Sequence, residues 1–209
     1  MSEFQSDREE AARKLGPLKW VIAAALVIGV AAVLYVIASA SFKPASAADL
    51  KDFKKASLEK LEVPAEPRAA PATVFTDMDG KPHTLADFKG QVVVMNLWAT
   101  WCAPCKREMP TLAKLQALYA TQPVKVLPIS VDKDVDLNLI QAEMAANPPL
   151  RSYRDPGYQM SFALEPRAQG YPTTVIYDKQ GRERARLAGD ADWSSKEARG
   201  LIEALLSEH

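Results

Sequence analysis

Cys102 and Cys105 are the only cysteines among the 209 residues of the chain, and two residues separate them. Two thiols at this spacing suit disulfide exchange, in which one thiol attacks a disulfide and the other resolves the mixed disulfide. If a helix begins with Cys102 at its N-cap, unpaired backbone N–H groups and the helix dipole lower the pKa of this thiol from ~8.5 towards 7 or below. Cys105, one helical turn later, is then close enough to resolve the mixed disulfide.

The composition disfavours several other functions. Lysine and arginine together number 26, as do aspartate and glutamate, so the chain lacks the basic excess typical of proteins that bind nucleic acid. His83 and His209 are the only histidines, which leaves a sparse set of ligands for a structural zinc site. One cysteine pair that closes so short a loop also crosslinks little of the chain. We therefore expect redox chemistry at the two cysteines, with no metal and no other cofactor.

A strand and a helix must meet at the cysteine pair. The sequence VVVMNLW, residues 92–98, is a continuous apolar run, which is typical of a strand buried on both faces of a sheet. Apolar residues then recur at helical spacing and predict a helix from Ala103 to about Ala120. The cysteines are thus expected at a strand-to-helix corner.

The remaining pattern predicts a mixed α/β domain. Residues 73–85 indicate a hairpin with Asp79-Gly80 at its turn, and Thr84 with Asp87 forms a capping box that opens a brief helix. A strand at 124–132 and a helix at about 135–146 come next. The order βαβα then ββα, with the cysteine pair at the first strand-to-helix corner, predicts a thioredoxin fold.

A second hairpin and a final helix complete this domain. PTTVIYD and RERARLAG form the predicted hairpin, whose outer strand would carry Arg182, Arg184 and Arg186 on one face and so protect a sheet edge. Ser194 and Glu197 predict a capping box for a helix to about Ser207. We interpret the arginine face, His83 and Trp193 as ordinary surface or core residues.

An uncharged apolar stretch at residues 20–42 precedes the domain. As a helix it would span ~34 Å, enough to cross a hydrocarbon core of ~30 Å. A signal peptide cleaved near Ala40 is the alternative, but the stretch is longer than the ~7–15 apolar residues usual in such signals. We therefore predict a single-pass anchor at 20–42, after a short cytoplasmic tail at 1–19.

Residues 43–71 are predicted to form a helix and a proline-rich linker. Leu50, Phe53, Leu58 and Leu61 lie at roughly helical spacing among charged residues, which indicates a short solvated amphipathic helix. The sequence PAEPRAAP that follows is typical of a semi-rigid linker. The thioredoxin-like domain then covers residues 72–209.

The sequence NLWATWCAPCKREMP, with GYPTTVIYDKQG and GDADWSS downstream, resembles the membrane-anchored thiol-disulfide oxidoreductases of the TlpA and ResA type, TlpA most closely. The similarity covers about residues 70–207. It implies a thioredoxin fold, with a central mixed sheet flanked by helices and an N-terminal β-hairpin extension, after one transmembrane helix. It also implies a domain in the periplasm, tethered to the inner membrane, that reduces disulfides.

The resemblance implies partners as well. Electrons would come from a membrane thiol transporter of the DsbD or CcdA type. The clients would be disulfide-bearing proteins of cytochrome oxidase copper-site assembly, such as a copper chaperone or the copper-binding oxidase subunit, or apocytochrome c during cytochrome c maturation.

Three residues at the cysteine motif take roles from the resemblance. Cys102 is the attacking thiol and Cys105 the resolving thiol. Glu108 holds the acidic position of the family, where it would tune thiol acidity or relay a proton to Cys105. The alternative is a first-turn glutamate that the helix dipole stabilises.

Three further residues form the substrate surface that the resemblance implies. Pro172 matches the cis-proline of the thioredoxin family, and the backbone of Tyr171 would pair with an incoming peptide strand. Trp101, directly before the attacking thiol, would border the same surface. Trp98 is expected in the core.

The direction of electron flow depends on the groups around the cysteines. The intervening Ala-Pro offers no cation to stabilise a thiolate, which argues against a strong oxidant and favours a reductant. Asn96 stands where many thioredoxins carry a buried aspartate, so a proton relay would need another group, with Glu108 as the candidate. A disulfide oxidant and a copper(I) carrier that uses both thiolates remain as alternatives.

Overall fold

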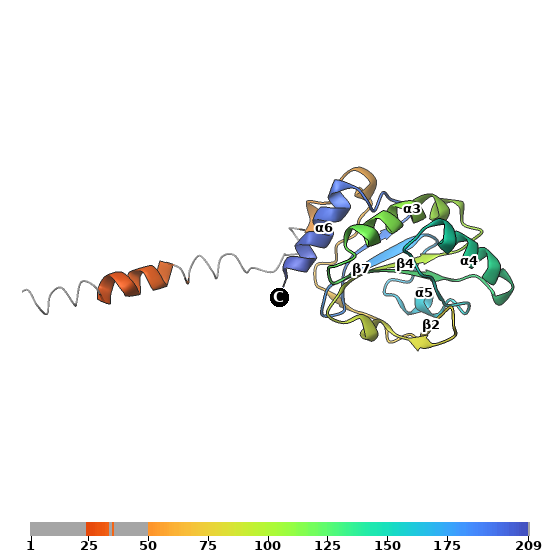
Figure 1. Ribbon diagram of the computed structural model, residues 1–209, viewed down its shortest axis with the longest axis horizontal. Helices are drawn as coiled ribbons and strands as arrows, with labels where there is room; N and C mark the ends of the chain where they lie inside the picture. The colour runs from red at the N-terminus through yellow and green to blue at the C-terminus, as the bar shows by residue number, and fades with distance from the viewer. Residues whose placement is uncertain (1–23, 34, 36–49, 209) are drawn as a thin grey trace, which may run out of the picture. The chain divides into compact units, whose positions relative to one another are not determined.

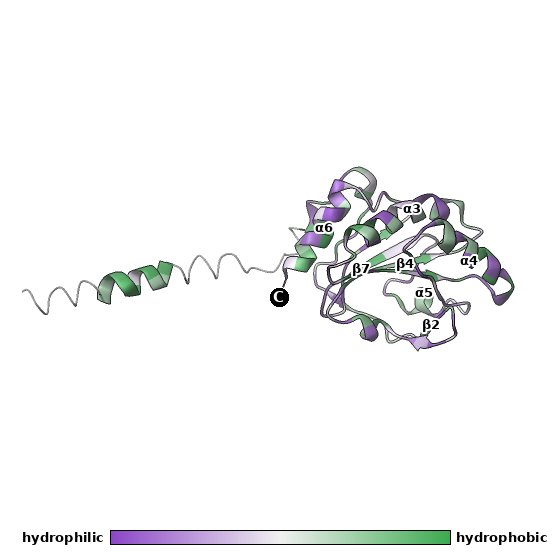
Figure 2. Ribbon diagram, viewed as in Figure 1, coloured by the Kyte–Doolittle hydropathy of each residue, from purple (hydrophilic) through white to green (hydrophobic). Residues whose placement is uncertain are grey.

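The computed structural model describes residues 24–33, 35 and 50–208, and the chain divides into two units between Lys43 and Pro44. Residues 24–33 are helical, and Figure 2 shows this segment as hydrophobic, with Leu26 and Val27 exposed. Among the described residues, no helix combines the length and apolar character needed to cross a membrane. The rest of the predicted span at 20–42, including the alternative cleavage site near Ala40, and the tail at 1–19 lie outside the described residues.

An eight-stranded mixed sheet forms the centre of the C-terminal unit, in the order β1-β8-β7-β4-β5-β6-β2-β3. Figure 1 labels its neighbouring strands β4 and β7. The central β4 (Val92–Trp98) runs parallel to β5 (Val124–Ser130) and antiparallel to β7 (Thr173–Tyr177). All residues of β4 are buried, as its continuous apolar run predicted. The other strands are β1 (Arg68–Ala69), β2 (Phe75–Asp77), β3 (Pro82–His83), β6 (Tyr153–Arg154) and β8 (Arg182–Ala188).

Helices cover both faces of this sheet. One buried cluster combines Val92, Val94 and Trp98 of β4 with residues of α3 (Ala103–Leu118), α4 (Leu137–Ala146) and α6 (Lys196–Ser207). The alternate β4 residues Val93, Met95 and Leu97 face a second cluster, which includes Met160 of α5 (Gln159–Ala163). This alternation of side chains follows from the two-residue period of a strand. The predicted thioredoxin fold is confirmed. Residues 50–208 also contain three short 3-10 helices: η1 (Ala56–Leu58), η2 (Leu85–Phe88) and η3 (Asp134–Asp136).

The predicted N-terminal hairpin is confirmed. β2 and β3 pair antiparallel, and Gly80 at their turn has a φ of +83°, a conformation that favours glycine. The predicted capping box of Thr84 and Asp87 is present and opens η2.

The prediction that β8 is a charged outer strand is wrong. β1 pairs with β8, and Glu62 adds a further bridge to Arg186. Arg184 and Arg186 are buried, where Arg186 pairs with Glu183 at 2.7 Å and Arg184 pairs with Asp178 at 3.3 Å. Buried charges require such partners, which the alternating arginines do not reveal by themselves.

The start of α6 differs from the prediction by one residue. Ser195, rather than Ser194, is the N-cap, and its hydroxyl accepts a hydrogen bond from the Ala198 N–H at 3.2 Å. Ser194 instead donates to the carboxylate of Asp192. The helix ends at Ser207, as predicted.

The segment 50–62 differs most from the prediction, because it packs against the domain as a largely irregular chain. Its regular element past Lys51 is the short helix η1, instead of the predicted amphipathic helix. Leu50, Leu58 and Leu61 are fully buried in the cluster that contains α6. Burying each leucine stabilises the fold by about 1.5–3 kcal/mol, which favours docking over a solvated spacer. The expected boundary at residue 72 therefore cuts through the core.

Candidate active site

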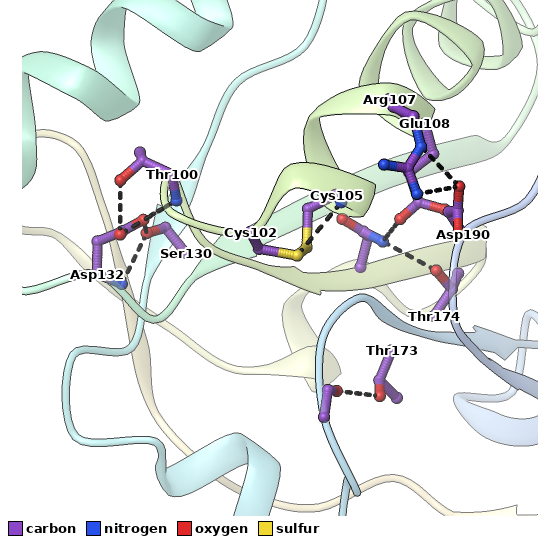
Figure 3. The surroundings of a disulfide bond; sticks show 12 residues. Thr100, Cys102, Cys105, Arg107, Glu108, Ser130, Asp132, Thr173, Thr174 and Asp190 are labelled. Carbon is purple, nitrogen blue, oxygen red and sulfur yellow. Dashed lines mark hydrogen bonds and ion pairs between the residues drawn. A yellow bond between two sulfur atoms is a disulfide. The ribbon is translucent and has the colours of Figure 1, made fainter.

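Cys102 and Cys105 form a disulfide at the start of α3, with an S–S distance of 2.07 Å (Figure 3). Cys102 is the N-cap residue, as predicted, and its Sγ accepts a hydrogen bond from the Cys105 N–H at 3.3 Å. Cys102 retains 5% of its surface exposed, whereas Cys105 retains none. An incoming disulfide or thiol therefore meets Cys102 first.

Glu108 lies one turn after Cys105 on α3, and its carboxylate is buried, with only 2% of the residue exposed. Its Oε2 accepts hydrogen bonds from the Ala191 N–H at 3.1 Å and from Trp193 Nε1 at 3.0 Å. Burial raises the pKa of Glu108 to about 7, and the nearby Asp190 adds to this, although the hydrogen bonds to the carboxylate oppose it. A carboxyl group with this pKa can exchange a proton near neutral pH.

Asn96 connects β4 with Glu108. The side chain is fully buried, and its Nδ2 donates to Glu108 Oε1 at 2.7 Å and to Thr174 Oγ1 at 2.9 Å. Its Oδ1 is buried and finds no hydrogen-bond partner in the described part of the chain. A polar network of β4, β7 and α3 thus surrounds the carboxylate behind the cysteine pair.

An aromatic surface borders the site. The side chain of Trp101 is 62% exposed, and its ring meets the ring of Tyr171 edge to face, with centroids 6.0 Å apart. The Tyr171-Pro172 bond is cis, as the resemblance implied. The ring of Tyr158 lies 6.4 Å from that of Tyr171 and extends this surface. The structure thus brings Trp101 and Tyr171 together, and their substrate-binding roles stay predictions.

Trp193 has a larger part in the site than the sequence suggested. The sequence pattern indicates an ordinary surface or core residue, yet Trp193 donates directly to Glu108 Oε2 and is itself fully buried. Its place within GDADWSS, one of the stretches that carry the resemblance, was the available signal.

His83 lies away from the cysteine pair, on the N-terminal hairpin. Its ring nitrogens lie 3.3 Å from the carboxylate of Asp77 and 3.4 Å from that of Asp87. Among the described residues, no group of three or more His, Cys, Asp or Glu side chains is arranged to hold a metal ion.

The sequence of the C-terminal unit is similar to those of known thiol-disulfide oxidoreductases. A family model described as Redoxin matches residues 65–202. Thiol-disulfide oxidoreductase ResA of Geobacillus thermodenitrificans is 31% identical over 121 residues, which are 57% of this chain and 67% of that protein. ResA of Bacillus thuringiensis subsp. konkukian is 30% identical over 133 residues, or 63% of this chain and 73% of that protein.

Solved structures share the architecture. The crystal structure of a DsbF homologue from Corynebacterium diphtheriae superposes with a TM-score of 0.57 at 26% identity. The match covers 69% of this chain and 90% of that one.

Proposed function

The chain belongs to the redoxin family, among the thiol-disulfide oxidoreductases of the ResA type. From this premise, we propose that the protein reduces disulfides in client proteins outside the cytoplasm. The observation that carries the proposal is the Cys102–Cys105 disulfide at the N-terminus of α3, with Cys102 as the more exposed member. This pair is the redox centre.

Reduction begins with the Cys102 thiolate. The N–H of Cys105 points at its sulfur, and such a hydrogen bond favours the thiolate over the thiol. The thiolate attacks one sulfur of the client disulfide and forms a mixed disulfide, while the other client sulfur leaves as a thiolate and takes a proton.

Cys105 and Glu108 complete the reaction. The Cys105 thiol gives its proton to the Glu108 carboxylate and attacks the Cys102 sulfur, which closes the disulfide seen in the structure. The second client sulfur leaves as a thiolate and takes a proton, so two electrons pass from the protein to the client. A dithiol donor must then reduce the Cys102–Cys105 pair again.

Trp101, Tyr171 and Pro172 form the surface against which the client lies. The backbone next to the cis bond would pair with an extended client segment, and the exposed ring of Trp101 would cover its apolar side chains.

The direction is reduction of the client. Ala103 and Pro104, between the cysteines, offer no charge that would stabilise a reduced thiolate strongly. The two cations that follow Cys105 are each paired with a carboxylate: Lys106 with Glu143 at 3.6 Å and Arg107 with Asp190 at 3.1 Å. A pair with less stabilised thiolates is a stronger reductant.

The proposal includes a single-pass anchor in the inner membrane and a catalytic domain in the periplasm. The exposed apolar helix at residues 24–33 and the uncharged stretch around it support the anchor. The resemblance to the TlpA and ResA type supports a DsbD- or CcdA-type transporter as donor. It also supports clients in cytochrome oxidase copper-site assembly or cytochrome c maturation.

Trapping tests the function and identifies the client. The Cys105→Ser variant is expected to retain clients as mixed disulfides on Cys102, and the Cys102→Ser/Cys105→Ser variant, as control, to retain none. A reduction potential well above that of the glutathione pool, with insulin left unreduced, would overturn the direction. A reporter joined after residue 209 that is active only in the cytoplasm would overturn the location.

A further inference from the structure

The turn between β4 and α3, residues 99–101, carries Trp101 and leads into Cys102. β4 and β5 are parallel neighbours, with Trp98 opposite Ser130 at their carboxyl ends. Thr100 and Asp132 each follow this pair by two residues. Because the carboxyl ends of adjacent parallel strands meet at one edge of the sheet, Asp132 lies directly beside the turn.

Asp132 holds this turn through its carboxylate (Figure 3). The Thr100 N–H donates to both carboxylate oxygens, at 3.1 and 2.9 Å, and the Thr100 hydroxyl donates to Oδ1 at 2.8 Å. The Ser130 hydroxyl donates to Oδ2 at 2.7 Å and accepts from the Asp132 N–H at 3.0 Å. The residue is only 2% exposed. Within the described part of the chain, this buried carboxylate therefore accepts hydrogen bonds from Thr100 of the active-site turn and from Ser130, the last residue of β5.

We propose that Asp132 is a positioning residue for disulfide exchange, which rests on the proposed function. By fixing Thr100, it holds the following Trp101 at the client surface. It also holds Cys102 at the N-cap, where the Cys105 N–H reaches its sulfur. Thiol-disulfide exchange needs the attacking sulfur aligned with the disulfide, so a looser turn slows the reaction even when the fold survives.

Two roles of the carboxylate make opposite predictions. If Asp132 acts through geometry, its loss frees Cys102 from the donated hydrogen bond, and the pKa of the Cys102 thiol rises. If Asp132 acts through its negative charge, any neutral replacement lowers that pKa, because an anion disfavours a nearby thiolate. Asparagine separates the two roles: it loses the charge, keeps an acceptor for Thr100 and can donate to the Ser130 hydroxyl.

The experiment compares Asp132→Ala, Asp132→Asn and Thr100→Val in the full chain. Ser130→Ala is the matched control, because it removes a hydrogen bond from the same carboxylate and leaves the turn attached. The thiol pKa of Cys102 is read from the pH dependence of its alkylation in the reduced protein, and insulin reduction gives the rate. Thermal unfolding records stability for each variant.

Asp132→Ala is expected to slow insulin reduction about tenfold and to raise the thiol pKa. Thr100→Val should change the rate of insulin reduction and the Cys102 thiol pKa in the same directions, but by smaller amounts. Asp132→Asn and Ser130→Ala should leave the rate and the pKa unchanged. Unchanged values in Asp132→Ala, or a pKa that falls alike in Asp132→Ala and Asp132→Asn, would overturn the proposal. If Asp132→Ala fails to fold, the comparison of Thr100→Val with Ser130→Ala tests the proposal. A slower insulin reduction and a higher Cys102 thiol pKa in Thr100→Val alone would support it, and equal values in the two variants would overturn it. A wild type that does not reduce insulin contradicts the proposed function instead, since alkylation still reports on Asp132.

Discussion

Asn96 Nδ2 donates to Glu108 Oε1 at 2.7 Å, while the buried Oδ1 of the same amide has no hydrogen-bond partner among the residues that the structure describes. Rotation of the amide by half a turn exchanges the two atoms, and Oδ1 then accepts a hydrogen bond from a protonated Glu108. Asn96 can therefore satisfy the carboxyl group in both of its protonation states. This suits a group whose pKa lies close to neutral pH.

Replacing Glu108 with glutamine should block the resolving step selectively. The amide of glutamine accepts no proton from Cys105, so resolution of the mixed disulfide should slow by about a hundredfold, a typical loss for a proton-transfer group. The variant should fold, because rotation of the Asn96 amide allows Oδ1 to accept from the glutamine nitrogen. The lifetime of the mixed disulfide after rapid mixing with a client peptide measures the effect.

Glu197→Gln, at a half-buried position in the first turn of α6, is the control for this change and should leave the lifetime of the mixed disulfide unaltered. If Glu108→Gln resolves the mixed disulfide as fast as the wild type, the proton-transfer role of Glu108 is wrong.

Stability should depend on pH through Glu108. Its pKa is 4.5 without the fold and about 7 within it, so between these values the folded protein holds more protons than the unfolded chain. The free energy of unfolding should therefore fall as the pH rises from 4.5 to 7 and stay low above 7, by about 3 kcal/mol at most. The difference between wild type and Glu108→Gln in urea unfolding, followed across this window, isolates the contribution. If the difference in unfolding free energy between the two proteins stays constant across this pH range, Glu108 does not cause the pH dependence.

Asn96→Asp should convert the pair into two buried carboxyl groups. Like charges this close cannot both ionise, so the two groups would share one proton and the upper apparent pKa would rise above that of Glu108 alone. At pH 8 the variant should lose about 3 kcal/mol of stability, the usual cost of an uncompensated buried charge, and should recover much of it at pH 5. Asn138→Asp, at an exposed position of α4, serves as the control. Equal losses at both pH values would argue against carboxyl repulsion.

Gly200 should reverse the usual effect of a helix mutation. Alanine in a helix interior is normally more stable than glycine by about 0.5–1 kcal/mol. At Gly200, however, a Cβ would lie 2.5 Å from the ring of Phe53. Gly200→Ala should therefore destabilise the protein, whereas in a Phe53→Ala background the same change should stabilise it. Chemical unfolding of the wild type, the two single variants and the double variant gives the coupling free energy between Gly200 and Phe53. If Gly200→Ala stabilises the protein in the wild-type background, segment 50–62 does not pack as described.

The parts of the fold that depend on neighbouring residues could be predicted from the sequence. The apolar run of β4, the proline-containing start of α3 and the glycine turn at residue 80 all act within a few residues. Cys102 at the N-cap followed from the same local pattern. Glu108 could be placed on the helix, three residues past Cys105, for the same reason.

What the sequence did not predict depends on distant partners. The Ala191 N–H and Trp193 that bury and bind Glu108 lie 83 and 85 residues along the chain from it. Arg184 and Arg186 alternate as on an exposed strand face, and only their acidic partners and the neighbouring β1 make them buried. Leu50, Leu58 and Leu61 suit either a helix or an irregular docked chain, and the surface offered by α6 decides between them.

The ion pair between Arg184 and Glu208 bears on how the protein should be labelled. Glu208 is buried to 2% exposure, and its carboxylate is held by an arginine of β8. Cargo joined directly after residue 209 therefore begins beside a buried charge pair and needs a flexible spacer. The tip of the β2–β3 hairpin, Asp79-Gly80, is exposed, so we expect it to accept an insertion without disturbing the core. A dye or affinity handle inserted there should leave both the α6 packing and the cysteine corner intact.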